Sequence, residues 1–188
     1  MANSLLPIAI TLGDVAGIGP EIVVKAFRDS PAQMRDCVVV GDVAAMQRAV
    51  DLLARVQPQA PRVQVLPVTQ LSELPRMRAT DGIPVLQVSK ALNAAQLPAW
   101  GQISAVAGQL AADAVVWAAH AALRGKVASV VTAPLHKEAL AAAGVPFPGH
   151  TEMLQACAAL HLGVAVDDLP VRMMLANPEL RTVLVSIH

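Results

Sequence analysis

Residues 5–21 read LLPIAITLGDVAGIGPE, and the order of residue types in this stretch decides the fold class. The apolar run at residues 5–11, rich in isoleucine, is typical of a buried strand. The glycines of residues 13–19 then predict a tight turn. Pro20 and Glu21 favour the first turn of a helix, because proline needs no N–H partner there and a carboxylate complements the helix dipole. The stretch therefore predicts a strand, a loop and a helix in succession.

The same alternation of strands and helices recurs along the chain. Apolar runs predict further strands at residues 37–41, 62–68, 83–88 and 127–132. Helical spacing and capping residues predict helices at residues 42–55 with Asp42 as cap, 103–125, 137–143, and 151–161 with Thr151 as cap. Strands that alternate with helices in this way predict a layered α/β fold.

The last part of the chain has a different pattern. Two strand-like runs, residues 171–176 and 181–187, flank the turn-forming tripeptide 177–179, Asn-Pro-Glu, so we expect an antiparallel hairpin. The expected sheet is therefore mixed and flanked by helices. Because the chain stops at His188 directly after a strand-like run, we also expect a sequence truncated at its C-terminus.

Composition excludes several classes of protein. The 188 residues carry 14 Lys and Arg against 14 Asp and Glu, and only four aromatic residues, so neither charge nor stacking favours nucleic-acid binding. The longest uncharged stretch, residues 91–112, is interrupted by Pro98 and Gly101, which argues against a membrane span. Cys37 and Cys157 sit among apolar neighbours and favour a reducing, cytoplasmic setting.

Two segments place polar side chains where α/β proteins bind ligands. Residues 132–137, TAPLHK, follow a predicted strand, and open α/β sheets bind ligands at the carboxyl ends of their strands. Lys137 there would either bind a phosphate or be a solvated residue of the first helical turn. Residues 146–152, PFPGHTE, form a stiff turn that presents His150 and Thr151, where Thr151 is a helix cap, a substrate contact or both.

The glycine-rich loop 13–19 leaves two interpretations open. Its glycines permit either a tight turn between strand and helix or an anion site at a helix N-terminus. Ile22 occupies the third glycine position of the dinucleotide fingerprint, and no Gly-Lys-Ser/Thr follows, so neither nucleotide motif is present. Asp14 is expected to be a turn residue or to act indirectly. A single histidine, His188, does not make a metal site by itself.

Four motifs in this order resemble the family of 4-hydroxythreonine-4-phosphate dehydrogenases, usually called PdxA. They are ITLGD with GIGPE at residues 10–21, TAP at 132–134 with Lys137, GVPF with GHTE at 144–152, and MMLA at 173–176 leading to His188. The resemblance spans the whole chain and covers the N-terminal part of the family protein. It implies a fold like that of isocitrate and isopropylmalate dehydrogenases, with residues 1–149 as a first α/β lobe and residues 150–188 as the start of a second.

The resemblance also implies roles for individual residues. His150 and Thr151 match substrate-binding residues, and Lys137 is a further polar contact in the cleft. His188 matches the first of three histidines that hold a divalent metal: zinc, magnesium or cobalt. The other two histidines and most of the NAD or NADP site lie further along the family chain. Family members are homodimers whose sites take residues from both subunits. This sequence has His136 where asparagine is frequent.

The implied reaction is the oxidation of 4-phosphohydroxy-L-threonine in pyridoxal 5'-phosphate biosynthesis. Its β-keto acid product loses CO₂ to give 3-amino-2-oxopropyl phosphate. Two alternatives stay open from the sequence. One is a paralogue that oxidises threonate or erythronate 4-phosphate with the same metal and cofactor, and the other is an inactive N-terminal fragment of such an enzyme.

Overall fold

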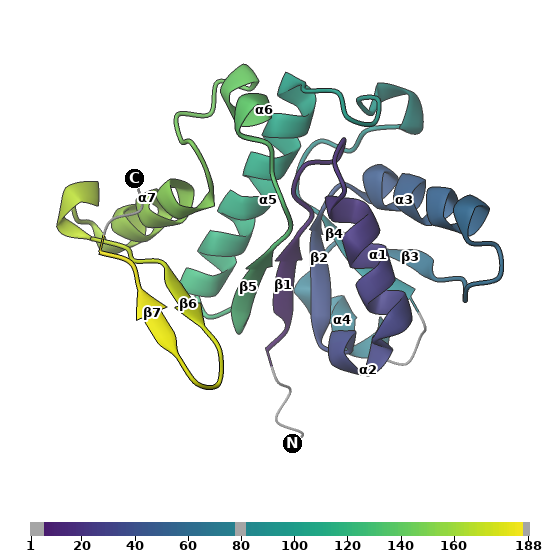
Figure 1. The fold of residues 1–188 in the computed structure, drawn as a ribbon, viewed down its shortest axis with the longest axis horizontal. Helices are drawn as coiled ribbons and strands as arrows, with labels where there is room; N and C mark the ends of the chain where they lie inside the picture. The colour runs from purple at the N-terminus through teal and green to yellow at the C-terminus, as the bar shows by residue number, and fades with distance from the viewer. Residues whose placement is uncertain (1–5, 78–81, 186–188) are drawn as a thin grey trace.

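A five-stranded parallel sheet lies at the centre of the molecule, in the order β3-β4-β2-β1-β5 (Figure 1). The structure is a computed structural model that describes residues 6–77 and 82–185. The strands are β1 (Ile8–Thr11), β2 (Cys37–Gly41), β3 (Gln64–Val68), β4 (Gly82–Gln87) and β5 (Ser129–Thr132). All five predicted strands of the α/β layer are confirmed, and the expected α/β class with them.

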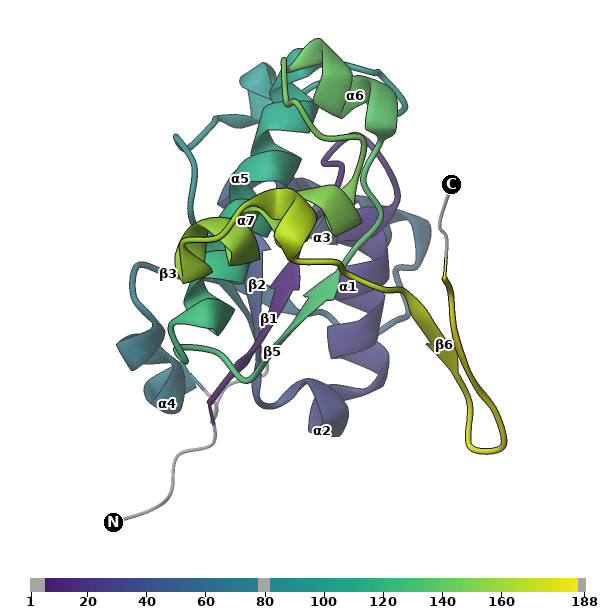
Figure 2. The ribbon, with the colours of Figure 1, turned by 90° about the vertical axis from the view of Figure 1, so that its left-hand side faces the viewer.

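Helices cover both faces of this sheet (Figures 1 and 2). They are α1 (Gly19–Asp29), α2 (Pro31–Met34), α3 (Val43–Val56), α4 (Leu74–Met77), α5 (Ala105–Leu123), α6 (Lys137–Ala142) and α7 (His150–Leu162). Three single 3₁₀ turns add Leu71–Glu73, Ala94–Gln96 and Val166–Asp168. The sequence predicts all of the longer helices and misses the four-residue helices α2 and α4.

The side chains of β1 alternate between the two faces of the sheet, and both sets are covered by helices. Ile10 packs into the large core cluster with residues of α1 and α3, whereas Ala9 packs against Ala114 and Ala118 of α5. Successive side chains of a strand point to opposite faces, so a strand with helices on both faces has to be apolar throughout. The resulting arrangement is helix, sheet, helix.

The long helix α5 is the core helix of one face. By length and composition it is apolar enough to cross a membrane, the one such helix in the part of the chain that the structure describes. More than half of its most apolar window, 56%, is buried inside the fold. Its apolar character is therefore accounted for by packing against the sheet and against α6 and α7.

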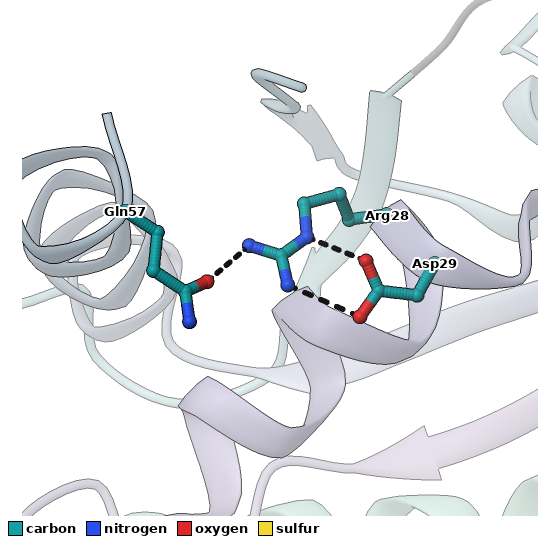
Figure 3. Close-up of polar contacts among 3 residues, drawn as sticks. All are labelled: Arg28, Asp29 and Gln57. Atoms are coloured by element: carbon teal, nitrogen blue, oxygen red, sulfur yellow. Dashed lines mark hydrogen bonds and ion pairs between the residues drawn. The ribbon is translucent and has the colours of Figure 1, made fainter. Parts of the chain in front are cut away.

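Polar contacts join α1 and α3, the helices on the face of the sheet opposite α5. At the end of α1, Arg28 donates from Nη1 to Oε1 of Gln57, the residue that follows α3, at 2.6 Å (Figure 3). The same guanidinium donates to both carboxylate oxygens of Asp29, at 2.6 and 3.1 Å (Figure 3). This hydrogen bonding raises the pKa of Arg28 and lowers the pKa of Asp29. Arg28 thus links the ends of α1 and α3.

The predicted hairpin is present but lies outside the central sheet. Strands β6 (Met174–Ala176) and β7 (Arg181–Val183) pair antiparallel in a separate two-stranded sheet. Within the described residues the five-stranded sheet is parallel throughout, so the expectation of one mixed sheet is wrong. The reason is that α7 and the turn after it lead the chain away from β5, and the hairpin extends free of the body (Figure 2).

Helix α7 packs on the first part of the chain. Met153 is buried in one cluster with Ala112 and Val115 of α5 and Leu140 of α6. The division into lobes at residues 149 and 150 stays a prediction, and α7 contributes to the core formed by the residues before it.

Candidate functional site

The glycine-rich loop after β1 and the segment after β5 lie side by side. Since β1 and β5 are parallel neighbours, their carboxyl ends meet at one edge of the sheet. The backbone N–H of Asp14 donates to the carbonyl of Pro134 at 2.8 Å, and that of Ala133 donates to Thr11 at 3.1 Å. Gly13 has φ +71°, and a Cβ at this position would overlap the carbonyl oxygen of Pro134. Glycine is therefore required for the two loops to meet.

Asp14 shapes the loop from within. Its Oδ1 accepts a hydrogen bond from the backbone N–H of Ala16 at 2.8 Å, and its carbonyl accepts from Gly17 at 3.1 Å. These are the contacts of an Asx turn, in which a short acidic side chain replaces a backbone acceptor. The expected turn role of Asp14 is present in the structure.

Arg48 on α3 braces the same loop from behind. Its Nη2 donates to the carbonyl of Val15 at 2.8 Å, and its Nη1 donates to the carbonyl of Pro98 at 2.6 Å. The guanidinium lies 4.1 Å from the centroid of the Trp100 ring. Burial lowers the pKa of Arg48. Sequence reasoning misses this residue because its partners are distant in the chain and no motif contains it.

Helix α6 begins at the end of residues 132–137, one of the two segments predicted to contact a ligand. His136 occupies its N-cap position and Lys137 is its first residue. The Lys137 side chain is exposed, so both interpretations of this lysine, phosphate contact or solvated first-turn residue, are compatible with its position. The sequence assigns no role to His136, yet its Nδ1 is buried and has no hydrogen-bond partner in the part of the chain that the structure describes. Its place in the segment after β5, at the carboxyl edge of the sheet, is the signal that identifies it.

Helix α7 starts two residues earlier than a cap at Thr151 predicts. It begins at His150, and Gly149 is the N-cap, with no side chain to accept a hydrogen bond from the first turn. The prediction that Thr151 caps this helix is therefore wrong. Gly149 has an extended backbone, and its carbonyl accepts a hydrogen bond from the backbone N–H of Met153 at 3.3 Å. Thr151 therefore lies inside the first turn, and its hydroxyl does not cap the helix.

His150 is a half-buried imidazole with an unused nitrogen. Its Nε2 is buried and has no hydrogen-bond partner among the described residues. Burial lowers the pKa of His150 because the charged form loses its hydration. A buried polar atom without a partner costs free energy, so such atoms in a folded protein are often explained by a function. Nε2 of His150 is therefore an unpaired polar atom that a functional contact would explain.

Lys137, His150 and Thr151 each lie in the first turn of a helix, α6 or α7. Leu140 and Met153, one turn further along α6 and α7, share one buried cluster. No hydrogen bond joins the side chains of Lys137, His150 and Thr151 in the described part of the chain. His188 lies outside the described residues. Within residues 6–77 and 82–185, no three His, Cys, Asp or Glu side chains form a group that fits a metal ion.

Two hollows in the surface differ in their relation to these residues. A cavity of about 550 Å³ lies at the opposite, amino end of the strands, beside Arg28 and Cys37, and contains none of the predicted site residues. A shallow groove of about 750 Å³ is lined by Phe147 and Met153, which flank His150 in sequence. The groove is thus lined by the GVPF motif, residues 144–147, whereas Lys137, His150 and Thr151 line neither hollow.

Comparison with known proteins supports the family resemblance. The sequence profile described as "Pyridoxal phosphate biosynthetic protein PdxA" matches residues 33–188. The chain belongs to the PdxA family. A 4-hydroxythreonine-4-phosphate dehydrogenase of Beijerinckia indica is 43% identical over 183 residues, which are 97% of this chain and 48% of the relative. A D-threonate 4-phosphate dehydrogenase of Salmonella typhimurium is 38% identical over 147 residues, 78% of this chain and 42% of the relative.

Solved structures of PdxA-family proteins share the fold. The crystal structure of a 4-hydroxythreonine-4-phosphate dehydrogenase from Burkholderia phymatum has a TM-score of 0.76 and 34% identity, covering 96% of this chain and 49% of that one. A corresponding enzyme from Klebsiella pneumoniae has the same TM-score at 31% identity, covering 97% and 50%. The chain thus spans about half the length of the relatives that it matches, and the expected family and fold are confirmed.

Proposed function

We propose that this chain supplies substrate contacts to a PdxA-type dehydrogenase that oxidises a four-carbon phosphorylated hydroxy acid, in the first place 4-phosphohydroxy-L-threonine. The observation that carries the proposal is the buried, unpartnered Nε2 of His150, at the turn where the family motif places a substrate-binding histidine. Membership of the PdxA family and relatives named as 4-hydroxythreonine-4-phosphate dehydrogenases support the choice of substrate.

His150 and Thr151 would bind oxygen atoms of the substrate. With its pKa lowered by burial, His150 is neutral near pH 7, so one ring nitrogen donates a hydrogen bond and the other accepts one. The first turn of α7 has no side-chain cap, which leaves backbone N–H groups able to donate to an anionic oxygen. The hydroxyl of Thr151 can donate to the same ligand. Lys137 would add a positive charge nearby.

The redox chemistry belongs to groups that the described residues do not hold. NAD or NADP would accept the hydride, and a divalent metal, zinc, magnesium or cobalt, would be bound by His188 with histidines from the rest of the family protein. Because the described residues include no metal-ligand cluster and the glycine loop lacks the dinucleotide fingerprint, we assign no step to either group. The cytoplasmic setting and the homodimer stay predictions.

A second candidate substrate is D-threonate 4-phosphate. Several relatives at 34–39% identity carry the name D-threonate 4-phosphate dehydrogenase. The two substrates differ at the carbon next to the carboxylate, where one has an amino group and the other a hydroxyl. A site that hydrogen-bonds one of these groups rejects the other, since its own polar atoms are then left unpaired. An inactive fragment of either enzyme is the third possibility.

Substrate binding by the 188-residue chain tests the proposal. We would titrate each phosphorylated acid into the chain and follow the imidazole proton resonances by NMR. We expect the His150 resonances to shift, and the His150→Ala variant to bind roughly tenfold more weakly, a loss of one or two hydrogen bonds. His161→Ala, which changes the exposed histidine at the other end of α7, is the matched control. Equal affinities for the two variants contradict the proposal.

A further inference from the structure

The cavity of about 550 Å³ lies at the amino ends of the strands, away from the proposed substrate contacts. Cys37 and Gly82, the first residues of β2 and β4, both line it. Its volume is within the range of about 300–1,000 Å³ that is typical of sites for small molecules. The substrate contacts proposed above lie elsewhere, on α6 and α7: Lys137, His150 and Thr151. The cavity is therefore a second place where this chain is able to bind a small molecule.

The interior of this cavity is apolar. Helix α1 contributes Phe27, which is 8% exposed, and the short helices α2 and α4 contribute Met34 and Leu74. Figures 1 and 2 show α2 and α4 at the amino ends of the strands, in the lower part of both views. Cys37 lies in the same wall, and burial raises the pKa of its thiol, so this residue adds no negative charge at neutral pH. The interior therefore suits the apolar part of a ligand.

The charged residues of the cavity leave an excess of one positive charge. Asp29 neutralises Arg28 by the two hydrogen bonds drawn in Figure 3. Arg35 and Arg62 also line the cavity and are exposed, and neither makes a hydrogen bond or ion pair with another residue of the described ranges. Asp36 adds one carboxylate to the lining. Two guanidinium groups against one carboxylate match a ligand that carries a single negative charge.

We propose that this cavity binds a small monocarboxylate with an apolar body. The carboxylate accepts hydrogen bonds from Arg35 and Arg62, because the planar guanidinium group matches the geometry of a carboxylate. The apolar body displaces water from Phe27 and Leu74, which contributes free energy in proportion to the apolar area that becomes buried. Asp36 disfavours a ligand with a second negative charge. A carboxylate without an apolar body, or an apolar molecule without a carboxylate, makes only part of these contacts.

Titration of decanoate into the 188-residue chain tests the proposal. The chain has two phenylalanines, Phe27 in this cavity and Phe147 in the groove beside α5, so incorporation of fluorophenylalanine gives two fluorine NMR resonances. The Phe147→Leu variant assigns them. We expect decanoate to shift the Phe27 resonance and to leave the Phe147 resonance in place. Decanol and acetate, which lack the carboxylate and the apolar body respectively, are expected to bind at least ~tenfold more weakly.

A pair of arginine variants tests the role of the charge. Arg62→Met is expected to weaken decanoate binding roughly tenfold, because it removes charge-assisted hydrogen bonds. Arg172→Met changes an exposed arginine that does not line the cavity and is the matched control. Both side chains are exposed, so both variants are expected to keep the Tm of the original chain. Equal affinities of the two variants for decanoate overturn the proposal, as does a Phe27 resonance that decanoate does not shift or a decanol affinity equal to that of decanoate.

His150→Ala separates this inference from the proposed function. It removes the proposed substrate contact but does not change the lining of the cavity, so it is expected to bind decanoate as tightly as the original chain does. Loss of decanoate binding in this variant would place decanoate at the substrate contacts and overturn the inference.

Discussion

The guanidinium of Arg48 lies 4.1 Å from the centroid of the Trp100 ring while its two terminal nitrogens donate to the carbonyls of Val15 and Pro98. One side chain on α3 thereby joins two loops at the carboxyl edge of the sheet. The backbone adds a direct link, from the N–H of Gly101 to the carbonyl of Ala16, at 2.7 Å. The glycine-rich loop is thus held in place from outside as well as by its own Asp14.

Replacing Arg48 is expected to loosen this loop. Arg48→Met keeps the length of the side chain but removes two charge-assisted hydrogen bonds and the cation–π contact, so we expect a loss of ~2–3 kcal/mol in the free energy of unfolding. Urea denaturation measures this. The exposed Arg35→Met is the control, with an expected change within about 0.5 kcal/mol. Similar losses for the two variants would show that Arg48 does not brace the loop.

Gly13 is expected to tolerate no side chain. Gly13→Ala combines a positive φ with overlap between the new Cβ and the carbonyl oxygen of Pro134, whereas Gly125→Ala has a positive φ of +63° and open space around it. We expect Gly125→Ala to cost ~1 kcal/mol and Gly13→Ala at least ~2 kcal/mol more. Thermal denaturation of the two variants compares them. Equal costs would mean that the loops are able to move apart freely.

Asp42 is expected to be the most important helix cap in the molecule. Its carboxylate is buried and accepts from the backbone N–H groups of Ala45 and Leu92 and from Nε2 of Gln87, at 2.9, 3.3 and 3.1 Å. Asp42→Ala leaves the two backbone N–H donors unpaired, whereas Nε2 of Gln87 keeps its hydrogen bonds to Ser89. We therefore expect a loss of ~3 kcal/mol in the free energy of unfolding. Ser104, which accepts one such bond at the start of α5, is the comparison: Ser104→Ala should cost ~1 kcal/mol.

Thr151 is expected to contribute little to stability. Because Gly149 holds the N-cap position, Thr151→Ala should change the free energy of unfolding by less than about 0.5 kcal/mol, against the ~1 kcal/mol typical of a lost cap. The same variant should bind the phosphorylated substrate more weakly. If Thr151→Ala loses as much stability as Ser104→Ala and binds the substrate as before, Thr151 caps the helix and does not contact the substrate.

His150 is expected to make stability depend on pH. Burial lowers its pKa below the ordinary value of 6.5, so the unfolded chain takes up a proton at a higher pH than the folded chain. The free energy of unfolding therefore falls as the pH decreases from 6.5 through the lowered pKa, and His150 has no such effect above that window. We expect His150→Gln to show a smaller decrease in Tm on acidification than the original chain. His161→Gln should keep the original slope, and an unchanged slope in His150→Gln would refute this assignment.

Local signals in the sequence were sufficient for most of the fold. Asp42 predicts its helix correctly because the cap and the helix it starts are neighbours in the chain. The error at Thr151 has a local cause too, since a glycine that adopts an extended backbone fills the cap position without any side-chain signal. The contact between Arg48 and Trp100 joins residues in different loops and helices, so only the folded chain reveals it. The error about the mixed sheet is similar, because pairing between β5 and the hairpin depends on where α7 directs the chain.

The position of β1 in the sheet has a consequence for synthesis on the ribosome. Ile8 pairs with Cys37 on one side and with Ser129 on the other, so β1 is made before both of its neighbours and acquires the second only after residue 129 has emerged. Until then one edge of β1 presents unpaired N–H and C=O groups to other nascent chains, and pairing over such sequence distances is slow. The early chain is thus most prone to misassembly while α5 is being translated, and a chaperone that binds the emerging β1 would protect it during that interval.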